Sequence, residues 1–243
     1  MRRFGLIGKN ISYSFSPGHF REKFLRMGLA DCRYDIFDLG EIGEFPALLS
    51  RYPDLEGLNV TIPYKEAVIP YLQELDPTAA AIGAVNTIRV SPGGLKGFNT
   101  DVVGFRDSLR PLLRGSDTAA LILGTGGASK AVAYALGQLG IPLRFVSRDP
   151  GPGQLSYEAL DAAMLREFPV IINCTPLGTY PAVSGAPAIP YAAITPAHLL
   201  YDLIYNPEQT KFLRKGAQQG ARTKNGLEML QLQAEASWEL WSP

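Results

Sequence analysis

The chain has 243 residues, of which 46% are hydrophobic, and its 23 basic side chains balance 23 acidic ones. That length suits one large or two small domains, and zero net charge predicts no broad attraction to nucleic acid or to a membrane surface. The two cysteines match no disulfide framework or metal-binding spacing, and no apolar run is long enough for a signal peptide or a membrane span, so we expect a cytoplasmic protein without a metal.

The first hundred residues alternate between strand and helix patterns, which predicts an α/β fold with a largely parallel sheet. The turn Ser91-Pro-Gly-Gly94 predicts a hairpin near the end of this region. The expected elements are strands at 4–8, 33–39 and 57–62, helices at 17–29 and 41–51, and a hairpin of 84–90 with 95–98.

A second α/β unit is predicted to follow, and its first strand is continuously apolar, as expected when both faces of a sheet are covered. Pro150-Gly-Pro-Gly153 stands where such a fold starts a helix, so we expect that helix to be short or missing. Residues 179–196 hold four prolines and predict a loop over a cleft. The expected elements are helices at 101–113, 128–139 and 227–241, the last folding back on the first unit, and strands at 118–123, 143–147, 170–173 and 199–203.

A glycine-rich segment from Leu123 to Ser129 joins the first strand of this unit to its helix. Gly124 permits a tight turn, and Gly126 lets the backbone approach a pyrophosphate at the helix N-terminus. Ser129 stands where the G-x-G-x-x-G pattern has its third glycine, so the match is imperfect. An ordinary glycine-rich turn is the alternative, but the strand–turn–helix context favours a dinucleotide.

The next strand ends at Ser147-Arg148-Asp149. At this position an arginine accommodates the 2′-phosphate of NADP, whereas a carboxylate binds the ribose 2′-hydroxyl of NAD. Arg148 comes first and its guanidinium pairs well with phosphate, but Asp149 would repel phosphate if it pointed inward. The pattern favours NADP, and a solvated turn is the alternative.

Polar side chains follow several predicted strands of the first half. Lys65 stands just past a strand and a turn, where α/β enzymes place proton-handling groups. Together with Asp101 it forms a candidate acid–base pair that would titrate as a coupled unit. Each of these residues, considered by itself, also fits an ordinary structural role. Lys65 would then be a solvated lysine at a helix start and Asp101 a helix cap, and Asn59, Thr61 and Asn86 would form turns.

The segment Ser14-Phe-Ser-Pro17 opens the first predicted helix. We expect Ser16 to be its N-cap, with Pro17 in the first helical position. Because a helix N-terminus favours an anion, Ser14 and Ser16 also predict a site for a carboxylate. Cys174 is expected to be a small buried residue, and Tyr205 a packing residue that lies on the cofactor side.

Together these motifs resemble the shikimate dehydrogenase family along the whole chain. The resemblance implies a substrate-binding α/β domain at residues 1–101, completed by a C-terminal helix at 225–243, and a Rossmann-like NADP-binding domain at 102–224. It implies reversible, NADPH-dependent reduction of 3-dehydroshikimate to shikimate in aromatic amino-acid biosynthesis. The matching segments are Ser14–Pro17, Asn59–Lys65, Gly83–Thr87, Asn99–Asp101, Gly124–Ser129, Asn173–Pro176, Tyr205–Pro207 and Gly226–Gln233.

The resemblance also implies roles for individual residues. Lys65 and Asp101 would form the catalytic pair, with Lys65 supplying a proton as hydride arrives. Ser14 and Ser16 would bind the substrate carboxylate. The remaining substrate contacts would come from Thr61, Asn86, Gln233 and Tyr205, and the cofactor contacts from Gly124, Gly126, Gly127, Ala128, Ser147, Arg148, Thr175 and Gly226.

Two alternatives remain at this point. The family commonly shows Asn-Arg-Thr or Asn-Arg-Ser where this chain has Ser147-Arg148-Asp149, which motivates a quinate/shikimate dehydrogenase that prefers NAD. A non-catalytic NADP-binding regulatory protein is the other alternative, and the intact Lys65/Asp101 pair argues against it. In each case we expect small-molecule ligands and a monomer or homodimer.

Overall fold

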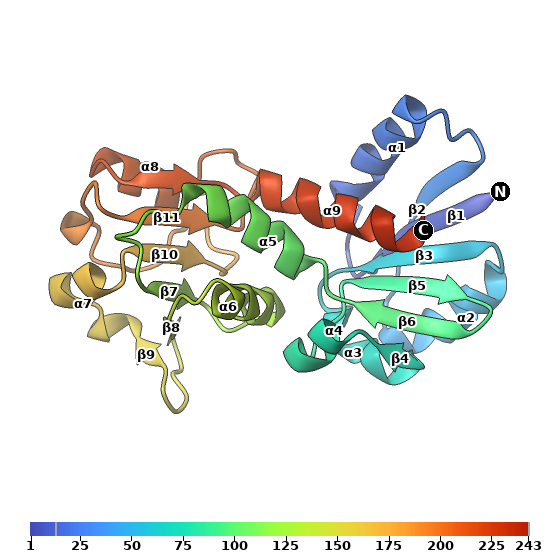
Figure 1. Ribbon diagram of the computed structural model, residues 1–243, viewed down its shortest axis with the longest axis horizontal. Coiled ribbons are helices and arrows are strands. Elements are labelled where there is room, and N and C mark those ends of the chain that lie inside the picture. Colours follow the sequence, from blue (N-terminus) through green and yellow to red (C-terminus); the bar gives the residue numbers. More distant parts are fainter. Residues whose placement is uncertain (13, 243) are drawn as a thin grey trace. The chain divides into compact units, whose positions relative to one another are not determined.

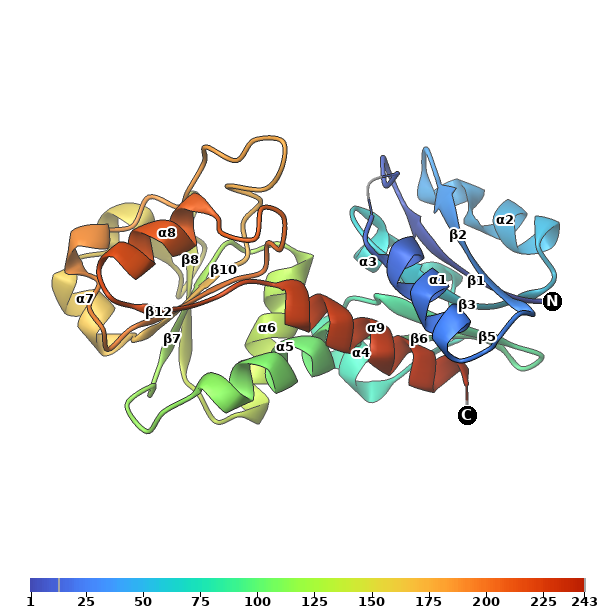
Figure 2. The same ribbon diagram turned by 90° about the horizontal axis from the view of Figure 1, so that it is seen from above.

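A computed structural model describes residues 1–12 and 14–242 (Figures 1 and 2). The chain divides into two compact units, unit 1 with Met1–Thr100 and Gln233–Pro243, and unit 2 with Asp101–Leu232. Helix α9, Leu227–Trp241, is therefore shared between the units. Tyr13 and Pro243 fall within the first predicted domain and lie outside the described residues.

Unit 1 contains a sheet in the order β2-β1-β3-β5-β6-β4 among its described residues (Figure 1). β1 pairs in parallel with β2 and β3, whereas β5 is antiparallel to both β3 and β6, because the chain reverses in the predicted hairpin. The sheet is therefore mixed, and the carboxyl ends of β3 and β6 meet the amino end of β5 at one edge. The elements are β1 Arg2–Gly8, α1 Ser16–Arg26, β2 Cys32–Asp38, α2 Phe45–Arg51, β3 Leu55–Val60, α3 Tyr64–Ala67, β4 Glu74–Leu75, α4 Pro77–Ile82, β5 Thr87–Ser91 and β6 Gly94–Phe98.

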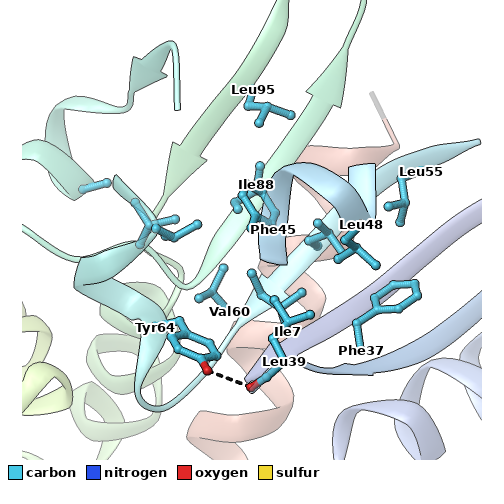
Figure 3. Close-up of a cluster of buried hydrophobic side chains, with 14 residues drawn as sticks. Ile7, Phe37, Leu39, Phe45, Leu48, Leu55, Val60, Tyr64, Ile88 and Leu95 are labelled. Carbon is cyan, nitrogen blue, oxygen red and sulfur yellow. Dashed lines mark hydrogen bonds between the residues drawn. The ribbon is translucent and has the colours of Figure 1, made fainter. Parts of the chain in front are cut away.

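Both faces of this sheet are covered by apolar side chains, as strand alternation requires. On one face, Phe45 of α2 packs with Ile88 of the hairpin, and the Tyr64 hydroxyl donates to the Leu39 carbonyl oxygen at 2.7 Å (Figure 3). On the other, side chains of α1 and of the end of α9 enclose Phe4, whose ring stacks on Trp241 at 5.1 Å between centroids. The last turns of α9 are thus part of the core of unit 1.

Unit 2 contains a parallel sheet in the order β12-β11-β10-β7-β8-β9 among its described residues (Figure 1). Between β8 and β10 the chain forms only a two-residue strand, a 3-10 turn and the six-residue α7, so the helix there is short, as predicted. The elements are α5 Asp101–Leu109, β7 Ala120–Leu123, α6 Gly127–Gln138, β8 Leu143–Ser147, β9 Leu155–Ser156, α7 Ala162–Glu167, β10 Val170–Asn173, β11 Leu199–Asp202, α8 Lys211–Gln218 and β12 Arg222–Lys224. In the part of the chain that the structure describes, none of the helices combines the length and apolarity needed to cross a membrane.

Candidate active site

One edge of the unit 1 sheet gathers three of the polar segments that the sequence singled out. The Val60 amide donates to the Asn86 carbonyl oxygen at 2.8 Å, and the Val85 amide donates to the Lys65 carbonyl oxygen at 2.7 Å. The Asn86 amide in turn donates to the Phe98 carbonyl oxygen at 3.0 Å. These backbone bonds join the segment after β3 to the residues that precede β5 and end β6, so Lys65 and Asn86 belong to one small region.

The side-chain amide of Asn86 has a fixed orientation. The Thr100 backbone amide donates to its Oδ1 at 2.7 Å, which turns its Nδ2 toward Thr100 Oγ1 at 3.0 Å and Gln233 Oε1 at 3.4 Å. Asn86 and Gln233 are only 3% and 7% exposed. Two of the residues predicted to bind substrate hydroxyls therefore contact each other, although they lie far apart in the sequence. Thr61, a third, starts the turn into α3, where its carbonyl oxygen accepts the Tyr64 amide at 2.9 Å.

The start of α1 differs from the prediction. The helix begins at Ser16, and Phe15 before it already has helical dihedral angles (φ −67°, ψ −39°) and makes no side-chain cap. The prediction that Ser16 is an N-cap was wrong, because the chain turns into the helix one residue earlier. The Ser16 side chain instead lies near the hydroxyl of Tyr34, whose pKa is raised by burial. Ser14 lies in the preceding turn, where its amide donates to the Ile11 carbonyl oxygen at 3.0 Å.

Asp101 is the first residue of α5 and follows Thr100 directly. It is 7% exposed. Because Lys65 belongs to unit 1 and Asp101 to unit 2, their action as an acid–base pair stays a prediction.

Unit 2 contains a cavity of about 620 Å³ at the carboxyl ends of β7, β8 and β10. From β7 the sheet continues to β8 on one side and to β10 on the other, and such a switch point is where open α/β sheets bind ligands. The lining includes Gly124, Gly126, Ser147, Arg148 and Thr175, all predicted cofactor residues. Gly127 and Ala128 begin α6 instead. Gly226 precedes α9, and its amide donates to the Ile204 carbonyl oxygen at 3.0 Å, beside Tyr205.

The glycine loop has the geometry of a phosphate-binding turn. Gly124 has a φ of +99°, a conformation that favours glycine, and a Cβ there would lie 3.0 Å from Thr175 Cγ2. A Cβ on Gly126 would meet no atom within 4 Å, so the backbone there is open to a ligand. Ser129 is buried and its hydroxyl donates to the Gly126 carbonyl oxygen at 2.6 Å. The twelve-residue helix α6 directs its N-terminus at this loop, which suits a pyrophosphate.

A buried polar group behind the cavity holds Thr175 in place. Asn173 Oδ1 accepts hydrogen bonds from the Thr175 amide at 3.0 Å and from its hydroxyl at 2.7 Å. The other end of the Asn173 amide donates to Asp202 Oδ1 at 3.0 Å, and the Thr210 hydroxyl donates to Asp202 Oδ2 at 2.6 Å. Burial raises the pKa of Asp202 to about 6. Cys174 was expected to be buried, but it is half-buried and lines the cavity. Desolvation still raises the pKa of its thiol, which is protonated at neutral pH and unsuited to be a nucleophile.

Several wall residues of the cavity escaped the sequence analysis. Tyr157 and Glu158 lie on a 3-10 turn after β9, a strand of two residues that leaves no periodic signal. Ala186 and Ala188 come from the proline-rich loop at 179–196 that was expected over a cleft. Among residues 1–12 and 14–242, no three His, Cys, Asp or Glu side chains are grouped as metal ligands would be.

The parallel sheet, the glycine loop and the cavity at the switch point define unit 2 as a dinucleotide-binding fold of the Rossmann type. A family model described as the shikimate dehydrogenase substrate binding domain matches residues 6–88. The shikimate dehydrogenase (NADP(+)) of Moorella thermoacetica is 39% identical, with 98% of this chain and 86% of the relative covered. That of Desulforamulus reducens is 36% identical, with 98% and 89% covered. The chain belongs to the shikimate dehydrogenase family.

A solved structure supports the same assignment for the whole fold. The shikimate 5-dehydrogenase of Thermus thermophilus, in complex with NADP(H) and shikimate, superposes with a TM-score of 0.89 at 31% identity. The match covers 100% of this chain and 94% of that one. The predicted family and the predicted two-domain α/β fold are confirmed.

Asp202 gives the stability of the protein a pH dependence of known sign. Its pKa is about 6 in the folded state and near 3.8 when unfolded, so the folded state holds more protons between pH 4 and pH 6. Stability is therefore lost as pH rises through this window, by about 3 kcal/mol at most. In Asp202→Asn this loss disappears, and the variant becomes more stable relative to the wild type at pH 7 than at pH 4. Urea unfolding from pH 4 to pH 7 measures the difference.

The matched control is Asp161→Asn, which replaces the exposed N-cap of α7 by an equally good cap. It should keep the wild-type pH dependence. An unchanged pH dependence in Asp202→Asn would show that Asp202 is not the group responsible.

Proposed function

We propose that this protein is a shikimate dehydrogenase that reduces 3-dehydroshikimate reversibly to shikimate with NADPH, in the chorismate pathway of aromatic amino-acid biosynthesis. The observation that carries the proposal is the polar edge of unit 1, with Lys65, Asn86 and Gln233, in a chain 39% identical to a relative named shikimate dehydrogenase (NADP(+)). In this proposal residues 1–101 and the C-terminal helix bind the substrate, and residues 102–224 bind the cofactor.

The substrate is held by hydrogen bonds from neutral side chains. Ser14 and Ser16 bind its carboxylate near the start of α1. Thr61, Asn86 and Gln233 bind its hydroxyls, and the burial of the two amides strengthens such bonds because little water competes for them. Tyr205 completes the contacts from the segment after β11.

The reduction needs a hydride and a proton. Bound NADPH supplies the hydride. Lys65 donates the proton to the carbonyl oxygen of 3-dehydroshikimate, and Asp101 is its partner in the catalytic pair. In the reverse direction the same pair removes the proton of the shikimate hydroxyl, since the two directions share one transition state.

The cavity of unit 2 fits NADP. Its size lies within the range of ligand sites, and its phosphate-binding turn is open at Gly126. Gly124, Gly126, Gly127 and Ala128 hold the pyrophosphate. Ser147 and Arg148 bind the 2′-phosphate, and Thr175 and Gly226 lie on the nicotinamide side.

We also propose a cytoplasmic enzyme, because both cysteines are free and the reaction draws on a soluble cofactor. Its working state is a monomer or a homodimer. The proposed location and the proposed oligomeric state both follow from the assignment as a shikimate dehydrogenase.

Steady-state assays of the wild-type protein with shikimate and quinate, each with NADP and NAD, test the proposed function. The highest kcat/KM is expected for shikimate with NADP. Dominant turnover of quinate with NAD would establish the quinate/shikimate dehydrogenase alternative. No turnover of either substrate, with NADP bound, would favour the regulatory alternative.

Replacing Lys65 by Met removes the proton donor and keeps an unbranched side chain. We expect kcat to fall by about 10²–10⁴-fold, the usual contribution of a general acid, with only a modest change in the KM for shikimate. Lys96→Met is the control, because it loses an ion pair with Glu74 of β4 and a contact with the ring of Phe98, neither of which is a proposed site residue. Unchanged turnover in Lys65→Met would remove Lys65 from the chemistry.

Arg148 is expected to set the preference for NADP. Arg148→Ala loses a charge-assisted contact with the 2′-phosphate, so the KM for NADP rises by about tenfold or more while kcat/KM with NAD changes little. Arg144→Ala is the matched control, because Arg144 is exposed on β8, the strand that Arg148 follows, and does not line the cavity. Equal losses with both cofactors would assign Arg148 to the adenosine and not to the phosphate.

A further inference from the structure

Three buried hydroxyls meet behind the polar edge of unit 1. Thr87 Oγ1 lies 2.8 Å from Ser237 Oγ and 3.1 Å from Thr100 Oγ1, and Ser237 Oγ lies 3.1 Å from Thr100 Oγ1. Thr87 and Ser237 are fully buried, and Thr100 is 3% exposed. We call these three residues the hydroxyl cluster. They come from β5, from the end of the hairpin and from α9, so the cluster exists only in the folded unit.

Asn59 joins the hydroxyl cluster to the start of α1. Its Nδ2 donates to Ser237 Oγ at 2.9 Å and to Thr87 Oγ1 at 3.2 Å. Its Oδ1 accepts the hydroxyl of Tyr34 at 2.8 Å, which fixes the orientation of the amide. Ser16, in the first turn of α1, lies close enough to the Tyr34 hydroxyl to act on it electrostatically. A chain of hydrogen bonds thus runs from Tyr34, which lies beside Ser16 of the proposed carboxylate site, to the cluster.

The hydroxyl cluster also holds the two amides at the other end of the proposed substrate site. The Thr87 hydroxyl donates to Asn86 Oδ1 at 3.0 Å, and the Asn86 Nδ2 donates to Thr100 Oγ1 at 3.0 Å. The Ser237 hydroxyl lies 2.9 Å from the backbone carbonyl oxygen of Gln233, one turn earlier in α9. The turn of helix that carries the Gln233 side chain is therefore fixed to the same cluster.

Burying so many polar groups is costly unless each one is satisfied, and apolar residues of similar size would fill the same space without that requirement. A fully connected network instead fixes the geometry of the groups at its ends. From these contacts we infer that Tyr34 and Ser237 are positioning residues, which orient Ser16 and the Asn86–Gln233 pair for the substrate without touching it. The inference rests on the proposed function.

The test removes one hydroxyl at a time. Tyr34→Phe keeps the ring that stacks on Phe20 at 4.5 Å between centroids, and Ser237→Ala leaves α9 with a good helix former. In each variant the KM for shikimate should rise by about three- to tenfold, the cost of losing one hydrogen bond, while the KM for NADP stays within about twofold of the wild-type value. A KM for shikimate within about twofold of wild type in both variants would overturn the inference.

Matched controls separate positioning from general loss of stability. Ser108 is likewise fully buried in a helix, and its hydroxyl donates to the carbonyl oxygen one turn earlier, that of Gly104, at 2.7 Å. It also lies 2.7 Å from the hydroxyl of Tyr201, which is fully buried. Ser108→Ala and Tyr201→Phe should lower the melting temperature but leave the KM for shikimate unchanged. An equal rise in KM in these controls would make the effect one of stability and overturn the inference.

A double-mutant cycle checks the path through Gln233. If Ser237 acts by orienting Gln233, then Ser237→Ala should add little to the KM for shikimate when Gln233 is already Ala. If the two substitutions raise the KM for shikimate by fully additive free energies, Ser237 does not act through Gln233. Turnover of shikimate by the wild-type protein in the same series tests the proposed function. The ratio of each variant's KM to the wild-type KM tests the positioning roles separately.

Discussion

The contact between Trp241 and Gly57 is the constraint on which unit 1 depends. A Cβ at Gly57 would overlap the indole, so the absence of a side chain at this position of β3 lets the ring pack against the strand. The indole Nε1 donates to the Ile88 carbonyl oxygen at 3.0 Å, and this bond fixes the ring along β5. Residues four apart in a helix share a face, so once Trp241 is fixed, Ser237 meets the other two members of the hydroxyl cluster and Gln233 meets Asn86. The last turns of α9 therefore complete the core of unit 1 and also position Gln233, which is proposed to bind the substrate.

Strong local patterns made much of the fold predictable. The strand at 170–173 and the helix at 227–241 match the predicted limits, because an apolar run that ends in a polar residue and a long amphipathic face are hard to mistake. Helix α8 was missed because Gly216 lies in its interior, where glycine weakens a helical pattern. The structure gives the reason for that glycine, since any Cβ there would overlap Leu200 of the sheet. Helix α4 was missed because six residues show too little periodicity, although Asp76 caps it well.

Some residues of the candidate site can be recognised from the sequence around them, and others only from contacts with distant parts of the chain. Lys65, Asn86 and the glycine loop could be singled out because polar or flexible residues interrupt apolar strands at their ends. Tyr34 and Ser237 could not, because each reads as an ordinary member of a strand or helix, and what sets them apart is contact with residues far away in the sequence. The cap at Ser16 was misassigned because Phe15 already has helical dihedral angles, which the sequence pattern does not reveal.

The two units hold their ligand-binding groups with different chemistry, and charge explains the difference. In unit 2 a buried carboxylate, Asp202, supports Thr175 from behind the cavity wall and does not itself line the cavity. In unit 1 the supporting groups around Asn86 are hydroxyls and amides, which carry no charge at any ordinary pH. A carboxylate in that place would repel the carboxylate of the proposed substrate and would change its hydrogen bonding on protonation. A neutral network therefore keeps the orientation of the proposed substrate-binding groups independent of pH, whereas the support of Thr175 by Asp202 changes as that carboxyl titrates.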